Sequence, residues 1–147
     1  MSEVNVAWQH LRTDQRLGQR LQDSFGTSYT QCAWFREYPA IQSSRQYGGC
    51  AIVALNSAVG RVVGSGADSS GLGRWCWLRL RGKANTHVRI ICAYRPVKNM
   101  RDSNSVYNQQ KWYYKSINLF DTCPQIQFTI DLESEISRFQ ADGDKIC

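Results

Sequence analysis

Residues 74–94, RWCWLRLRGKANTHVRIICAY, decide the fold. Side chains alternate between two faces of a strand from Arg74 to Arg81, with Trp75, Trp77 and Arg79 on one face and Cys76, Leu78 and Leu80 on the other. Gly82-Lys83-Ala84-Asn85 is typical of a hairpin turn. A second strand runs from Val88 to Tyr94 and is ended by Pro96. The stretch predicts an antiparallel hairpin in which the tryptophans serve packing rather than base stacking.

Shorter apolar runs on the N-terminal side extend this sheet structure. We predict strands over Ser28–Trp34, Cys50–Leu55 and Val59–Gly64, and a loop over Ser65–Gly73 because glycines and small residues dominate there. The apolar positions on these runs should be buried in adjoining strands, namely Ile52, Val53, Leu78, Leu80, Ile90 and Ile91.

Helical periodicity marks the rest of the chain. Val6–Phe25 has a basic stripe at Arg12, Arg16 and Arg20, and Gly26 follows it. A second helix, capped by Ser105 and ending at Phe120, has Val106, Tyr113 and Ile117 on one side. The third runs from Pro124 to Ala141 and is stopped by Gly143, with the start of a strand at Lys145-Ile146-Cys147. The predicted fold class is α/β, a partial two-sheet sandwich flanked by helices.

Length and composition suit one soluble domain or part of one, spanning residues 1–147. Hydrophobic residues make up 42% and charged residues 20% of the chain, which is enough apolar material for a core. No apolar run reaches 18 residues, and Met1–His10 lacks the features of a signal peptide. We therefore expect an intracellular protein with no membrane partner.

The net charge of +6 comes mainly from arginine, with 13 Arg against 5 Lys. Arginine forms bidentate hydrogen bonds with phosphate and stacks on aromatic rings, so this excess of arginine favours a nucleic-acid partner. A solubilising surface charge explains the same composition equally well.

Cysteines and carboxylates give weaker signals. The six cysteines are far apart, without the close ligand pairs of a structural zinc site, and Cys50, Cys76 and Cys92 lie in apolar runs as buried thiols. We interpret Asp68 and Asp144 as turn and helix-stop residues. The acidic group on the last helix is interpreted as its solvated face, made of Asp131, Glu133 and Glu135.

Several short motifs occur in a recognisable order: Glu3-Val4-Asn5-Val6-Ala7-Trp8, Gly48-Gly49-Cys50-Ala51-Ile52, Asp68-Ser69-Ser70-Gly71-Leu72-Gly73-Arg74-Trp75, Ala93-Tyr94-Arg95-Pro96, Ser105-Val106-Tyr107-Asn108-Gln109-Gln110 and Gly143-Asp144-Lys145-Ile146. The series resembles the endonuclease/exonuclease/phosphatase superfamily, with its exonuclease III-like and DNase I-like fold, in the branch of retroelement endonucleases. The resemblance covers nearly the whole chain.

The resemblance implies metal-assisted hydrolysis of phosphodiesters in nucleic acid, with DNA as the expected partner and no small-molecule cofactor. Glu3 matches the family's early glutamate that holds Mg²⁺, and Tyr94 matches the tyrosine near the scissile phosphate. Arg74 and Arg95, at strand ends, are the candidate phosphate contacts.

The family's remaining catalytic residues have no counterpart in the chain. Its first-strand Asn would precede Met1, its Asp-x-Asn pair would follow Cys147, and neither His10 nor His87 matches its histidine. The expectation is therefore a truncated domain of weak or no activity. The alternative is a non-catalytic, arginine-rich nucleic-acid-binding module, which would bind without any need for metal.

Overall fold

The computed structural model describes residues 29–34, 49–99, 101–103 and 105–147, with backbone placement alone for 29–34. Two sheets form its centre. Strands β1 (Tyr29–Trp34) and β2 (Cys50–Leu55) pair antiparallel, and a four-stranded sheet has the order β3-β4-β5-β6. The predicted helix over residues 6–25 lies outside the described residues.

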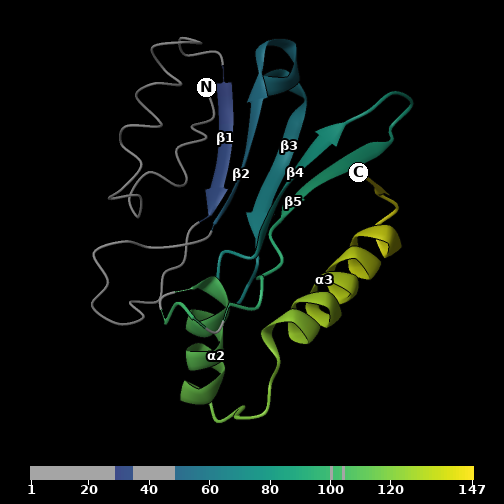
Figure 1. Ribbon diagram of the computed structural model, residues 1–147. Coiled ribbons are helices and arrows are strands. Elements are labelled where there is room, and N and C mark those ends of the chain that lie inside the picture. The colour runs from purple at the N-terminus through teal and green to yellow at the C-terminus, as the bar shows by residue number, and fades with distance from the viewer. Residues whose placement is uncertain (1–28, 35–48, 100, 104) are drawn as a thin grey trace.

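The four-stranded sheet is built on the predicted hairpin. Strand β4 (Trp75–Arg81) pairs antiparallel with β5 (His87–Ala93) along its whole length, and also with β3 (Val62–Ala67). The short β6 (Lys145–Ile146) lies parallel to β5. Figure 1 shows helix α3 (Pro124–Ala141) on the side of this sheet away from β1 and β2, and helix α2 (Val106–Ser116) beyond the end of the strands. The α/β class is confirmed.

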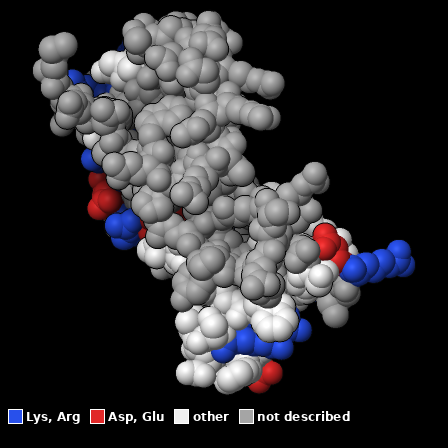
Figure 2. Space-filling view, turned by 90° about the vertical axis from the view of Figure 1, so that its left-hand side faces the viewer, with Lys and Arg blue, Asp and Glu red and all other residues white. Residues whose placement is uncertain are grey.

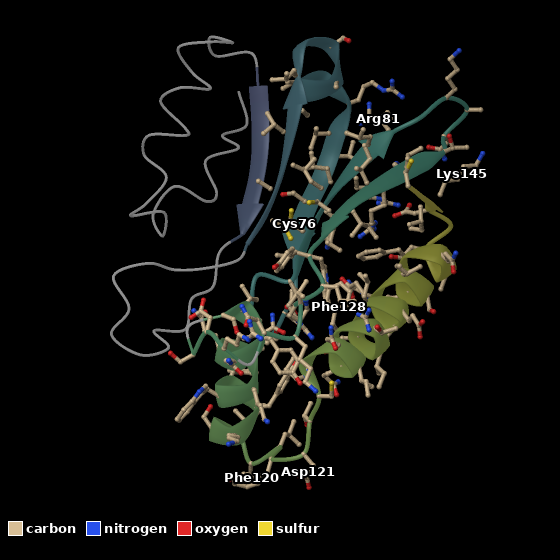
Figure 3. All side chains as sticks on the ribbon, viewed as in Figure 1. Cys76, Arg81, Phe120, Asp121, Phe128 and Lys145 are labelled. Carbon is tan, nitrogen blue, oxygen red and sulfur yellow. The ribbon has the colours of Figure 1, made fainter. Side chains whose placement is uncertain are left out.

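Both faces of β4 are covered, as its alternation requires. One face joins the core between the sheets, where the buried residues are Cys50, Ala54, Cys76 and Leu78. On the other face, Trp75 meets Phe128 and Trp77 meets Phe139 edge to face, with ring centroids 5.9 and 5.4 Å apart. Phe128 points from α3 toward the strands in Figure 3. The tryptophans are thus packing groups, as predicted.

Of the six residues predicted for the core, Leu78 is fully buried. The other five, Ile52, Val53, Leu80, Ile90 and Ile91, lie on strands β2, β4 and β5 as expected but are half-buried. Ile52 packs against the core between the two sheets.

The strand predicted over Val59–Gly64 is displaced. Residues Asn56–Arg61 form a 3-10 helix, η2, and the strand runs instead over Val62–Ala67 into the predicted loop. Tertiary packing explains this, because a Cβ on Gly66 would stand 2.5 Å from the Trp77 ring. The small residues that suggest a loop are what let a strand lie under a tryptophan.

Helix α2 begins at the predicted cap and ends early. The Asn108 N–H donates to Ser105 Oγ at 3.3 Å. Asn118 adopts a left-handed backbone (φ 64°), and the N–H of Leu119 reaches back to the Tyr114 carbonyl, which stops the helix before Phe120. The buried face is also different from the predicted one: Tyr107, Gln110 and Tyr114 are buried, whereas Ile117 is exposed.

Candidate phosphate-contact site at the end of β5

Tyr94 and Arg95 follow directly after β5, at the end of the sheet that lies nearest α2 in Figure 1. The Tyr94 side chain is 41% exposed and Arg95 is exposed as well. Glu3, the expected metal ligand, lies outside the described residues. Two of the four predicted site residues therefore share one exposed strand end.

The backbone of this segment is held on both sides. The Tyr94 N–H donates to the Arg74 carbonyl at 2.8 Å, and the Cys50 thiol donates to the same carbonyl at 3.4 Å. Pro96 is fully buried, and the Gln125 amide donates to its carbonyl at 3.0 Å. Because strand β2, the residue before β4 and helix α3 all contribute, the backbone that carries the Tyr94 phenol and the Arg95 guanidinium is held in place.

Arg74 was expected to face phosphate, and the structure corrects this. It is only 2% exposed, and its Nε and Nη2 donate to the two oxygens of Asp68 at 2.5 and 2.9 Å. Its Nη1 donates to Asp131 at 2.7 Å and to the Tyr114 hydroxyl at 3.2 Å. The guanidinium also lies 4.5 Å from the Trp75 ring centroid. Arg74 is an internal cation that joins the loop before β4 to both helices.

The carboxylates around Arg74 also differ from expectation. Asp68 does make the predicted turn contact, accepting from the Ser70 N–H at 3.0 Å, but it is buried in the ion pair as well. Asp131 is not simply part of a solvated helix face, since it binds Arg74. Burial alone would raise the pKa of Asp68, but the hydrogen bonds and charge of Arg74 outweigh it, so this pKa lies below its usual value. Burial raises the pKa of Tyr114 to about 12.

A second arginine–aspartate cluster fixes the far end of α3. Asp144, expected to be a helix-stop residue, is buried and accepts hydrogen bonds from Arg79 at 2.7 Å and from Arg89 at 2.6 Å. The Arg89 guanidinium lies over the rings of Phe139 and Trp77, at 3.7 and 4.3 Å from their centroids. The cluster therefore ties the end of α3 and the start of β6 to the middle of the sheet.

The described residues do not fit a magnesium site. Mg²⁺ binds carboxylates that keep free oxygen lone pairs. The carboxylates nearest Tyr94 in the hydrogen-bond network, Asp68 and Asp131, are both bound to Arg74. Within residues 49–99 and 105–147, as in the rest of the described chain, no group of three His, Cys, Asp or Glu could hold a metal ion. A larger metal ligand set would have to draw on residues outside the described part of the chain, of which Glu3 is the predicted one.

Two exposed cations near Tyr94 were not singled out from the sequence. Lys98 and Arg101 follow Arg95 at intervals of three residues and are exposed. Their signal is the spacing Arg95, Lys98, Arg101 directly after a strand-ending tyrosine. Individually each resembles an ordinary surface cation, so only their common loop distinguishes them.

Exposed cations also lie at the opposite end of the sheet, at Arg81, Lys83 and Lys145. On the face shown in Figure 2, blue and red side chains of the described residues are interspersed, with no broad patch of one sign. None of the helices among the described residues is long and apolar enough to cross a membrane. Neither a protein-family model, nor a curated protein, nor a solved structure matches the chain.

Proposed function

We propose that this chain is part of a Mg²⁺-dependent phosphodiesterase domain acting on DNA, of the endonuclease/exonuclease/phosphatase type with a DNase I-like fold. The observation that carries the proposal is the exposed pair Tyr94 and Arg95 on a backbone held by Arg74 and Gln125. A phenol donates one hydrogen bond to a phosphate oxygen, and a guanidinium can donate two in parallel. The resemblance of the sequence motifs also implies a place near the scissile phosphate for Tyr94.

The chain's own residues supply binding and orientation in this proposal. Tyr94 would donate to a non-bridging phosphate oxygen, and Arg95 would neutralise part of the phosphate charge. Magnesium, when bound, would supply charge stabilisation and an activated water. We expect only trace hydrolysis for two reasons. The carboxylates of Asp68 and Asp131 are paired with Arg74, and His87 begins β5, so this histidine lies at the opposite end of the strand from Tyr94.

Among the described residues, four arginines are taken up by ion pairs within the protein and are not available to a general arginine-rich binding surface. Arg74, Arg79, Arg89 and Arg138 each pair with a carboxylate of the chain itself. Three of these pairs involve buried aspartates, so their guanidinium groups contribute to folding and not to a free basic surface.

Nicking of supercoiled plasmid tests the proposal, with Mg²⁺ or with EDTA, over long incubations. We expect trace nicking that EDTA abolishes and that Tyr94→Phe lowers about 10- to 100-fold, the value of one hydrogen bond to a charged group. Tyr113→Phe on α2 is the control and should leave the rate unchanged. DNA binding without any Mg²⁺-dependent nicking would favour the binding module instead. Robust nicking lost in Glu3→Gln would show that the incomplete catalytic set is supplied otherwise, for example by a second chain.

A further inference from the structure

The loop that follows Tyr94 carries exposed cations at regular spacing. Arg95, Lys98 and Arg101 are all exposed, and no ion pair joins any of them to a carboxylate of the described residues. Asp102 contributes one negative charge, so the loop carries three positive charges and one negative, a net +2. This contrasts with Arg74 and Arg89, whose charges are neutralised inside the protein.

Hydrogen bonds to both helices hold the loop backbone. Besides the Gln125 contact with Pro96, the Asn99 carbonyl accepts from Ser105 Oγ at 3.1 Å and from Asn108 Nδ2 at 3.0 Å. The same Asn108 amide donates to the Asp102 carbonyl at 2.7 Å. The carbonyls of Pro96, Asn99 and Asp102 are thus held by the first turns of α2 and α3, which lowers the entropy cost of using the neighbouring cations in binding.

We propose that residues 94–99 and 101–103 form a phosphate-contacting rim, in which Arg95, Lys98 and Arg101 bind backbone phosphates of a DNA strand that passes Tyr94. The choice of DNA rests on the proposed function and on the composition of the loop. Guanidinium groups suit phosphate, and the exposed Tyr94 ring at the start of the loop offers a face on which a base can stack.

Salt dependence of binding measures phosphate contacts directly. Each neutralised phosphate of duplex DNA contributes about 0.9 to the slope of log affinity against log salt. We would titrate a fluorescent duplex of about 20 base pairs in EDTA at several NaCl concentrations between roughly 50 and 200 mM. The rim variant is Arg95→Gln/Lys98→Gln/Arg101→Gln. It should reduce the slope by about two to three and weaken binding at least about tenfold near 100 mM salt.

A matched control removes the same charge from the opposite end of the sheet. The variant Arg81→Gln/Lys83→Gln/Lys145→Gln changes three exposed cations. Figure 3 shows Arg81 and Lys145 at the end of the molecule away from Phe120 and Asp121. It should change the slope by less than about one. Thermal melting would confirm that both variants are folded.

The outcomes separate the rim from the proposed hydrolase. An equal change of slope in both variants, or no change in the rim variant, would overturn the rim proposal. So would an equal loss of affinity for poly-L-glutamate, which would indicate an acidic protein partner. Because binding is measured in EDTA, a lowered slope without any nicking keeps the rim and rejects hydrolysis. Mg²⁺-dependent nicking together with an unchanged slope in the rim variant rejects the rim and supports hydrolysis.

Discussion

Replacing Arg74 by methionine should destabilise the protein strongly, because it leaves Asp68 buried without its counter-ion. The two side chains are 2% and 1% exposed, so water cannot replace the lost guanidinium. Methionine keeps the apolar volume beside Trp75, and the change therefore removes charge and hydrogen bonds rather than packing.

The cost follows from the partners that lose their cation. Breaking a buried ion pair by removing one member costs about 3–5 kcal/mol. Asp131 adds little to this, since its side chain is 32% exposed and can be solvated. We therefore expect the free energy of unfolding to fall by about 4 kcal/mol, which is a large part of the roughly 5–15 kcal/mol of a typical domain.

Urea unfolding at pH 7 and pH 4.5 is the assay. In the wild type, the lowered pKa of Asp68 means that its stabilisation is present above about pH 4 and is lost as the pH falls through the folded-state value. In Arg74→Met, burial without the guanidinium raises that pKa, so protonation relieves the penalty in acid. The difference in unfolding free energy between the two proteins should therefore be larger at pH 7 than at pH 4.5.

Two further variants make the reasoning refutable. Arg138→Met breaks a pair with Glu135 in which the arginine is 62% exposed, and should cost no more than about 1 kcal/mol. The double variant Asp68→Asn/Arg74→Met should cost at least about 2 kcal/mol less than the sum of its single changes. Additive single changes, or a cost for Arg74→Met no larger than for Arg138→Met, would show that the buried pair does not behave as argued.

Packing and thiol chemistry give two more tests. Gly66→Ala should lower the unfolding free energy by about 1–3 kcal/mol, because its Cβ would overlap the Trp77 ring, whereas Gly60→Ala, with nothing within 4 Å, should change it little; equal urea midpoints would contradict this. Backbone N–H groups at the start of α3 lower the pKa of Cys123, while burial raises that of Cys50 to about 12. Iodoacetamide at pH 7.5 should therefore alkylate Cys123 well before Cys50 in mass-spectrometric time courses, and the reverse order would refute the assignment.

The elements that the sequence predicts well are those with strong local signals. Helix α3 runs from Pro124 to Ala141 as predicted, because Pro124 suits a first helical position and Gly143 adopts the left-handed backbone (φ 81°) that ends the helix. The hairpin of β4 and β5 is also as predicted, since its alternation fits a strand covered on both faces. The predicted position of strand β3 is wrong because Gly66 favours a loop in the sequence, whereas in the folded protein it makes room for the Trp77 ring.

The candidate site likewise has one residue whose position local sequence predicts and one whose position it does not. That Tyr94 lies at an exposed strand end follows from its position between an apolar run and Pro96. The burial of Arg74 does not follow from local sequence, because one of its partners, Asp131, is 57 residues away on α3. Spacing rules report neighbours along an element, and a pair between elements becomes visible only in the folded structure.

The placement of the arginine–aspartate pairs also changes what the basic composition implies. Asp131 joins the first half of α3 to Arg74, and Asp144 joins the segment after α3 to Arg79 and Arg89. The helix is thus tied to the sheet at two points. Because the Arg74 carbonyl holds the Tyr94 N–H, the first of these ties also positions the exposed phenol. The number of arginines in the chain therefore says less about function than does the identity of the arginines that remain exposed.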